Sequence, residues 1–291
     1  MEAFAYSAPE SVAETLALLD AYAKEGRRTQ FLAGGTDVLV QLRTSDFAAR
    51  TLIDLKAIPE ATRLSMDGDT TYIGAAIASA VLNENEALKA RFPGLLEAAD
   101  LIGSTQIQGR ASIGGNLSNA SPAGDSIPAL LANDAVCVIA TPSGERCLKA
   151  EEFVVGVGKN ALAKGEFLLG LEIANPDDRT ADAYQRFIPR TEMDIAVAGC
   201  GVRLSLDADG VCVAARVAIG AVAPTALLVP AAGDALVGTK LDPAALAAAG
   251  LACSAAASPI DDKRGTVEYR RKIVAVLCRR TALVAQGRAA Q

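Results

Sequence analysis

Two short segments of this 291-residue chain place paired glycines beside small polar side chains. The first reads LAGGTDVLVQLR over residues 32–43, and the second reads ASIGGNLSNASPAGD over residues 111–125. Glycine has no side chain to cover the backbone, so a ligand rich in acceptor oxygens can approach several N–H groups at once. A helix that begins after such a turn adds oriented N–H groups and a positive dipole end. The chemistry that fits is the binding of a diphosphate, and two such turns favour it more strongly than one.

Hydroxyl, amide and carboxylate side chains flank these glycines. Thr36 follows the first pair, and Ser112 and Asn116 lie on either side of the second. Asp37 and Asp125 are poor direct neighbours for a phosphate because like charges repel. We expect each aspartate either to cap a helix or to accept a hydrogen bond from a ribose hydroxyl or a flavin edge.

The sequence does not match the other common nucleotide-binding motifs. GVGKN at residues 156–160 has Phe153 where a P-loop requires its first glycine, and Asn160 replaces Ser or Thr. Neither glycine pair belongs to the G-x-G-x-x-G pattern of a dinucleotide-binding βαβ unit. The sequence therefore gives no support to an NAD site of that kind.

The chain contains no histidine, which removes the commonest general base and metal ligand and the usual covalent anchor for a flavin. Six cysteines are scattered without a CxxC pair, so neither a zinc site nor an iron–sulfur cluster is predicted. Most of them are expected to be small buried hydrophobic residues. Any catalysis must then rely on carboxylates, lysine, backbone groups or a bound cofactor.

Size and charge narrow the class of protein further. A chain of 291 residues predicts two domains, or one domain with an added layer. The net charge of −6 and a pI near 4.9 argue against nucleic acid as a partner. No signal peptide is visible, and the longest stretch of low polarity, residues 244–257, is shorter than the ~20 residues needed to span a bilayer. These features predict a cytoplasmic protein without membrane insertion.

Periodicity predicts the elements that must position the glycines. A capping box at Ser11 and Glu14 begins a helix that ends before Gly26, and a strand, the first glycine turn, a short helix and a second strand follow. A polar linker is expected over 174–182. The predicted helices cover 9–25, 37–43, 93–102, 127–132, 242–257 and 265–286, and the predicted strands and hairpins cover 27–33, 51–55, 63–77, 135–140, 166–173 and 195–222.

Four segments together resemble the FAD-binding medium subunit of the molybdenum hydroxylases, the xanthine dehydrogenase and carbon monoxide dehydrogenase family. They read FLAGGTDVLVQL, ASIGGNLSNASPAGD, FLLGLEI and AYQRFIPRTEMDIAVAG. The similarity extends to GTVEYRRKIVAVLCRR near the end of the chain, and the paired AGGTD and IGGN motifs at this separation are quite specific.

The resemblance implies FAD-binding residues at matching positions. Arg186 stands where many relatives carry a lysine, and QIQGR departs from the commoner Q-I-R-N form just before the second loop. The implied cofactor-binding set comprises the first loop (Ala33, Gly34, Gly35, Thr36, Asp37 and Val38), the second loop (Ser112, Ile113, Gly114, Gly115 and Asn116), the acidic contact Asp125, the apolar Leu168 beside the flavin ring, and Arg186.

The family resemblance also implies the fold. We expect an α+β FAD-binding domain of the vanillyl-alcohol oxidase (PCMH-like) type over 1–176, with subdomains of about 1–57 and 58–176. A smaller α+β domain over 177–291 is expected to hold a three-stranded antiparallel sheet and helices.

The implied function is electron transfer within a heteromeric oxidoreductase. A large subunit carries the molybdenum cofactor, a small subunit carries two [2Fe–2S] clusters, and this chain's noncovalent FAD receives the electrons and passes them to an external acceptor. No side chain here is expected to be catalytic or to bind a metal, and the complex is expected to be a dimer of heterotrimers. The substrate and the terminal acceptor stay open.

Two other functions remain as alternatives. One is a stand-alone FAD-dependent reductase of the same domain type using NAD(P)H, although no catalytic acid is identifiable. The other is a flavin-free assembly or scaffold protein, against which the intact glycine segments argue.

Overall fold

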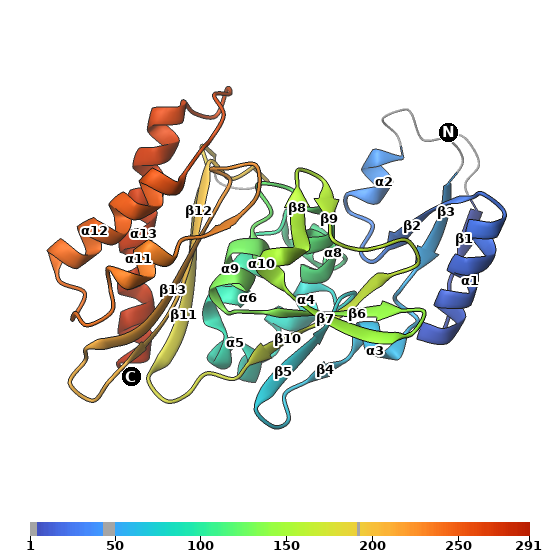
Figure 1. Cartoon of the computed structure of the whole chain (residues 1–291), viewed down its shortest axis with the longest axis horizontal. Helices are drawn as coiled ribbons and strands as arrows, with labels where there is room; N and C mark the ends of the chain where they lie inside the picture. Colours follow the sequence, from blue (N-terminus) through green and yellow to red (C-terminus); the bar gives the residue numbers. More distant parts are fainter. Residues whose placement is uncertain (1–4, 43–49, 191–192) are drawn as a thin grey trace.

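A computed structural model of the chain describes residues 5–42, 50–190 and 193–291. A parallel sheet of strand order β1-β3-β2 lies near the N-terminus and is coloured blue in Figure 1. Ser11 Oγ accepts from the Glu14 N–H at 3.2 Å and Gly26 follows the helix with φ +69°, so both predicted ends of the first helix are confirmed. The elements of this N-terminal subdomain are β1 (Ala5–Ser7), α1 (Val12–Lys24), β2 (Arg28–Leu32), α2 (Val38–Gln41) and β3 (Arg50–Asp54).

A second subdomain is built on a five-stranded antiparallel sheet of order β4-β5-β10-β6-β7. Most of its helices pack together with β5, β6 and β10 in one apolar core. The strands are β4 (Leu64–Ser65), β5 (Thr70–Gly74), β6 (Val136–Thr141), β7 (Gly144–Lys149), β10 (Phe167–Ala174) and the separate β8–β9 hairpin (Val154–Gly156, Lys159–Asn160); the helices are α3 (Pro59–Thr62), α4 (Ser79–Asn83), α5 (Glu86–Arg91), α6 (Pro93–Asp100), α7 (Thr105–Gln108), α8 (Ile113–Asn119), α9 (Ser126–Ala132) and α10 (Ala150–Phe153).

The C-terminal part, drawn in yellow to red in Figure 1, is an antiparallel sheet with helices on one face. Three long strands match the predicted three-stranded sheet, and a two-residue strand adds a fourth at the edge. Its elements are β11 (Thr180–Phe187), β12 (Ala198–Leu206), β13 (Cys212–Gly220), β14 (Leu227–Leu228), α11 (Pro230–Asp234), α12 (Pro243–Ala256) and α13 (Val267–Ala289).

The predicted α+β fold class is confirmed, but two local predictions are wrong and several short helices are not predicted. The second glycine pair lies within the first turn of α8, not in a loop. The helices α3, α4, α5, α7, α10 and α11 lie outside the predicted set, because helices of four to six residues are too short to show a clear period of apolar residues. The polar run 174–182 does not stay a linker to its end, since β11 begins at Thr180 and Asp182 is buried.

The C-terminal sheet packs closely on two helices of the preceding subdomain. A Cβ on Gly94 in α6 would lie 2.5 Å from the Ala183 backbone, and a Cβ on Gly201 in β12 would lie 2.8 Å from the Pro128 carbonyl in α9. The core of the second subdomain includes buried Tyr184 from β11. The C-terminal sheet and the second subdomain therefore share part of one apolar core in addition to their surface contacts.

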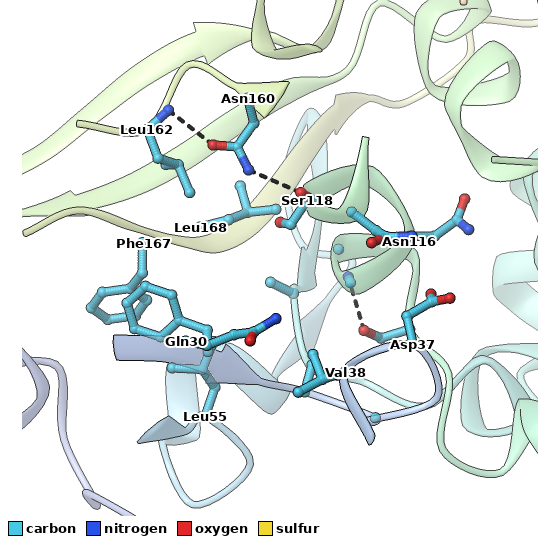
Figure 2. Close-up of a pocket in the computed structure, with 18 of the residues that line it drawn as sticks. Gln30, Asp37, Val38, Leu55, Asn116, Ser118, Asn160, Leu162, Phe167 and Leu168 are labelled. Carbon is cyan, nitrogen blue, oxygen red and sulfur yellow. Dashed lines mark hydrogen bonds between the residues drawn. The ribbon is translucent and has the colours of Figure 1, made fainter. Parts of the chain in front are cut away.

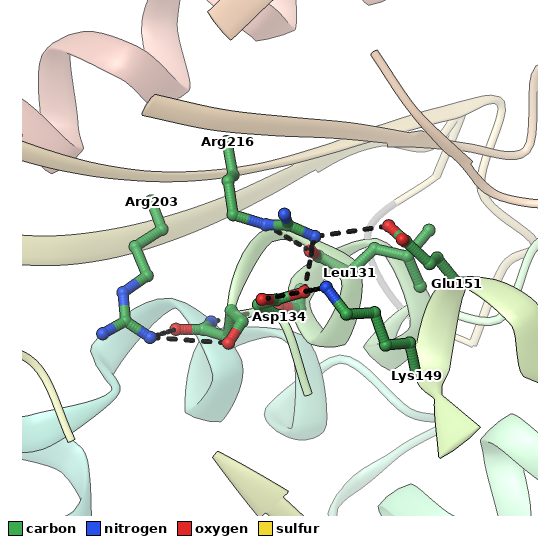
Figure 3. A network of polar contacts seen from close by, with 8 residues as sticks. Leu131, Asp134, Lys149, Glu151, Arg203 and Arg216 are labelled. Carbon is green, nitrogen blue, oxygen red and sulfur yellow. Dashed lines mark hydrogen bonds and ion pairs between the residues drawn. The ribbon is translucent and has the colours of Figure 1, made fainter. Parts of the chain in front are cut away.

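Charged side chains of the C-terminal sheet also bind the ends of these helices. Asp182 accepts from the N–H groups of Gly94 and Leu95, both at 2.9 Å, in the first turn of α6. At the C-terminal end of α9, Arg216 donates to the Leu131 carbonyl at 3.0 Å and pairs with Asp134 at 3.0 Å, as Figure 3 shows. Each charge has the sign that a helix dipole favours at that end.

Five of the six cysteines are buried, as predicted, whereas Cys147 on β7 is exposed. None of the six forms a disulfide. Among the described residues no helix is long and apolar enough to cross a membrane, and no group of three or more acidic or cysteine side chains is arranged to hold a metal ion.

Candidate functional site

A pocket of about 590 Å³ lies between the N-terminal parallel sheet and the second subdomain. Residues from both glycine segments line it, together with side chains from β2, β9 and β10 (Figure 2). The size falls within the usual range for a small-molecule or cofactor site. The parts of the chain that form it are far apart in sequence, so the fold itself assembles the pocket.

The first glycine segment connects β2 to α2 along one wall. Gly35 adopts φ +78°, a left-handed conformation that favours glycine. A Cβ on Gly34 would lie 1.9 Å from the Arg110 carbonyl oxygen, so this glycine is required by close backbone packing. Within the described part of the chain, the N–H groups of Gly34, Gly35 and Thr36 donate to no protein acceptor. Three backbone donors on the pocket wall are thus available to a ligand.

The second glycine pair lies at the start of α8 on the facing wall. Ser112 caps the helix, since its Oγ accepts from the Gly115 N–H at 3.0 Å. A Cβ on Gly114 would lie 2.5 Å from the Ala75 carbonyl oxygen, so Gly114 also permits close packing. A Cβ on Gly115 would meet only Ser112 Oγ at 2.9 Å and Ala33 Cβ at 3.8 Å. The two segments therefore lie against each other, as a shared diphosphate site requires.

Asp37 and Asp125 do not cap helices with their side chains. Asp37 precedes α2 without a side-chain capping bond, lines the pocket, and has a pKa raised by burial. Asp125 precedes α9, and its carboxylate accepts from the Tyr184 hydroxyl at 2.9 Å and from Arg186 at 2.6 Å. The capping alternative is therefore wrong for both residues, and the contact with a ribose hydroxyl or flavin edge stays a prediction for both.

Arg186 and Asp125 form a buried ion pair behind the pocket, between β11 and α9. Burial raises the pKa of Asp125 to about 6, even though Arg186 and the Tyr184 hydroxyl oppose the shift. The pair is linked to the pocket by the next residue, because Ser126 Oγ donates at 2.7 Å to Oδ1 of Asn116, which lines the wall. Neither Asp125 nor Arg186 lines the pocket itself.

The structure brings most of the predicted residues together. Ala33, Gly34, Gly35, Thr36, Asp37, Val38, Ser112, Gly114, Gly115, Asn116 and Leu168 all line the pocket. Ile113 points into the core instead and is 1% exposed, while Asp125 and Arg186 stand one layer behind.

Several residues that line the pocket lie outside the set predicted from the sequence. Asn160 donates from Nδ2 to the Ser118 carbonyl at 2.9 Å, which ties β9 to α8 beside the pocket (Figure 2). Phe31 and Phe167 pack with ring centroids 5.4 Å apart in the apolar part of the wall. Only their positions in short apolar strands singled out these aromatics, and such a strand indicates burial, not ligand contact.

The residues present fit an FAD. Open backbone donors and the space beside Gly115 suit its diphosphate, and an apolar wall that includes Leu168 suits its ring system. The fold and this pocket together define an α+β flavin-binding protein with an appended antiparallel domain.

The chain belongs to the flavoprotein family of the molybdopterin dehydrogenases. Residues 2–176 match the family model described as the FAD binding domain in molybdopterin dehydrogenase, and residues 183–285 match that of the CO dehydrogenase flavoprotein C-terminal domain. It is the FAD-binding medium subunit of a molybdenum hydroxylase, as the motifs implied.

Relatives and solved structures agree with this assignment. The chain is 33% identical to the carbon monoxide dehydrogenase medium chain of Afipia carboxidovorans, covering 98% of each. It is 32% identical to the xanthine dehydrogenase FAD-binding subunit of Escherichia coli O157:H7, covering 68% of each. The carbon monoxide dehydrogenase structure from Hydrogenophaga pseudoflava superposes with a TM-score of 0.92 at 32% identity, covering 99% of this chain and 98% of that one. These relatives are subunits of larger enzymes, so a stand-alone reductase is not favoured.

Proposed function

We propose that the pocket between the two subdomains holds one noncovalent FAD. The segments 33–38 and 112–116 would bind its diphosphate, and Leu168 would contact its ring system. Asp125 and Arg186 would support Asn116 from behind, through Ser126. The observation that carries the proposal is that the two glycine segments, about eighty residues apart, line one pocket, and that the N–H groups of Gly34, Gly35 and Thr36 have no acceptor among the described residues.

Bound FAD would supply the redox chemistry, accepting electrons from the [2Fe–2S] clusters of a partner subunit and passing them to an external acceptor. The chain's own residues bind the cofactor, orient it and keep water from one side of it. The apolar residues Phe31, Leu55, Phe167 and Leu168 line the wall and favour exclusion of water from a bound ring. No lining side chain is required as nucleophile or base.

The complex is heteromeric, as in the relatives, and we propose a dimer of heterotrimers in the cytoplasm. Each heterotrimer would contain this chain, a large molybdopterin-binding subunit and a small [2Fe–2S] subunit. Native mass spectrometry of the complex purified through a tag on this chain measures the stoichiometry, and fractionation of the cells tests the location. A complex that lacks either partner, or contains one copy of each, would contradict the arrangement.

We also propose that the FAD-binding unit ends near residue 176, with subdomains of about 1–57 and 58–176, and that residues 177–291 form the second domain. The end of β10 at Ala174 and the start of β11 at Thr180 support this boundary.

Titration of the flavin-free full chain with FAD tests the proposal. We expect saturation at one FAD per chain, seen as a change in flavin fluorescence, and full release of the flavin into the supernatant on acid denaturation. Flavin that stays with the precipitated peptide would contradict noncovalent binding. A chain that does not bind FAD would overturn the assignment of the pocket.

A further inference from the structure

Lys56 lies behind the first glycine segment, outside the pocket wall. Its ammonium group donates to the Ala33 carbonyl oxygen at 2.8 Å, and it pairs with both carboxylate oxygens of Asp54 at 2.7 and 2.8 Å. The Tyr6 hydroxyl donates to the same carboxylate at 2.7 Å. Three side chains, one from β1, one at the end of β3 and one two residues beyond it, therefore form a hydrogen-bonded row that reaches the backbone between β2 and the glycines.

The bond to Ala33 fixes the direction of the next N–H group. In a trans peptide the carbonyl and the N–H of one unit point in opposite directions, and the carbonyl of Ala33 shares its unit with the N–H of Gly34. Because Lys56 holds the carbonyl on its own side of the segment, the Gly34 N–H points to the other side. Ala33 and Gly34 line the pocket and Lys56 does not, so that other side is the pocket side.

We propose that Lys56 is a positioning residue for the cofactor: it orients and polarises the Ala33–Gly34 peptide so that the Gly34 N–H donates to the diphosphate of FAD. The inference rests on the proposed FAD site and deepens it. A cation on the carbonyl strengthens the N–H of the same peptide as a donor, because hydrogen bonds in a chain polarise one another.

The charge of Lys56 does not act directly on the anion. Asp54 neutralises it at 2.7 Å, and the Asp54 side chain is only 9% exposed. Burial raises the pKa of Asp54, but the hydrogen bonds from Lys56 and Tyr6 outweigh burial and hold that pKa below its usual value. The Asp54 carboxylate is therefore ionised at neutral pH and offsets the ammonium charge beside it, so the effect of Lys56 on the ligand passes through the backbone.

Binding of FAD to the flavin-free full chain, measured by flavin fluorescence, tests this role with the K56M variant. The expected dissociation constant is about tenfold or more above that of the wild type, since one hydrogen bond involving a charged group is weakened. K24M is the matched control: Lys24 pairs with Asp20 at 2.6 Å on the exposed face of α1, in the same subdomain, and does not line the pocket. K24M is expected to bind FAD like the wild type.

Rescue separates positioning from a general loss of structure. K56R keeps a cation that can reach the Ala33 carbonyl, so it is expected to recover most of the affinity lost in K56M. Y6F, which leaves the bond from Lys56 to Ala33 in place, is expected to weaken binding less than K56M. If the melting temperature of K56M is well below that of K24M, the FAD affinity of K56R decides the question. An affinity restored in K56R supports the positioning role of Lys56. An affinity as weak as that of K56M overturns it.

The outcomes also separate this inference from the proposed site. K56M that binds FAD as tightly as the wild type overturns the role of Lys56 and leaves the pocket assignment intact. A wild-type chain that does not bind FAD overturns the pocket assignment itself.

Discussion

Among the residues of the site, Gly34 and Gly115 lack a side chain for different reasons. Gly34 has no room for one, because the Arg110 carbonyl occupies the position of its Cβ. Gly115 has room on the protein side except for a serine hydroxyl that can rotate, and its open side belongs to the pocket. Substitution at Gly34 therefore tests packing, whereas substitution at Gly115 tests the ligand.

G115A is the sharper probe of cofactor binding. We expect its FAD affinity to fall about tenfold or more, because a methyl group would occupy space beside the diphosphate. Its stability is expected to change by less than about 1 kcal/mol, since the helix propensity gained by alanine offsets weakening of the Ser112 cap. Fluorescence titration and urea denaturation measure the two effects separately.

G287A in α13 is the control, because a Cβ there meets nothing within 4 Å. It should bind FAD like the wild type. Equal FAD affinities for G115A and G287A would show that the diphosphate does not pass Gly115.

At the scale of elements, two helices of the FAD-binding part each have one end bound by a charged side chain of the C-terminal sheet. The first turn of α6 donates to Asp182 in β11, and the last carbonyls of α9 accept from Arg216 in β13. Helices of seven or eight residues are marginal by themselves. The C-terminal sheet therefore stabilises both helices, and α9 in turn carries Asp125 and Ser126 behind the pocket.

D182A tests this dependence. The substitution leaves the N–H groups of Gly94 and Leu95 and the amide of Asn133 without their buried acceptor. We expect a loss of about 3 kcal/mol or more in the free energy of unfolding, measured by urea denaturation. D20A is the control, because Asp20 is exposed and, among the described residues, pairs only with Lys24 on α1. A D182A loss no larger than that of D20A would refute the capping role.

The sequence predicted long elements well and short or tertiary features poorly. The helix N-cap at Ser11, the long β12–β13 hairpin and the two C-terminal helices carry strong local signals, and all are confirmed. The glycine pairs marked the pocket because their chemistry is local. Lys56 and Asn160 gave no such signal, because their partners, Ala33 and Ser118, are 23 and 42 residues away.

Across the whole molecule, the two parts are expected to unfold together. Tyr184 and Ala218 of the C-terminal sheet belong to the core of the second subdomain. The ion pairs of Arg216 with Asp134 and Glu151, drawn in Figure 3, cross the same interface. We expect one transition in scanning calorimetry, with the calorimetric enthalpy equal to the van't Hoff enthalpy. Two resolved transitions would show that the interface is weaker than its packing indicates. The K24M variant provides a reference, because its substitution lies far from this interface in the chain.

The distribution of thiols has a practical consequence. Since five cysteines are buried and Cys147 stands exposed on the edge strand β7, a maleimide dye would mark the folded chain at one known place. Such a reporter needs no engineering of the sequence. Protection of that thiol upon assembly would reveal whether a neighbouring subunit covers β7.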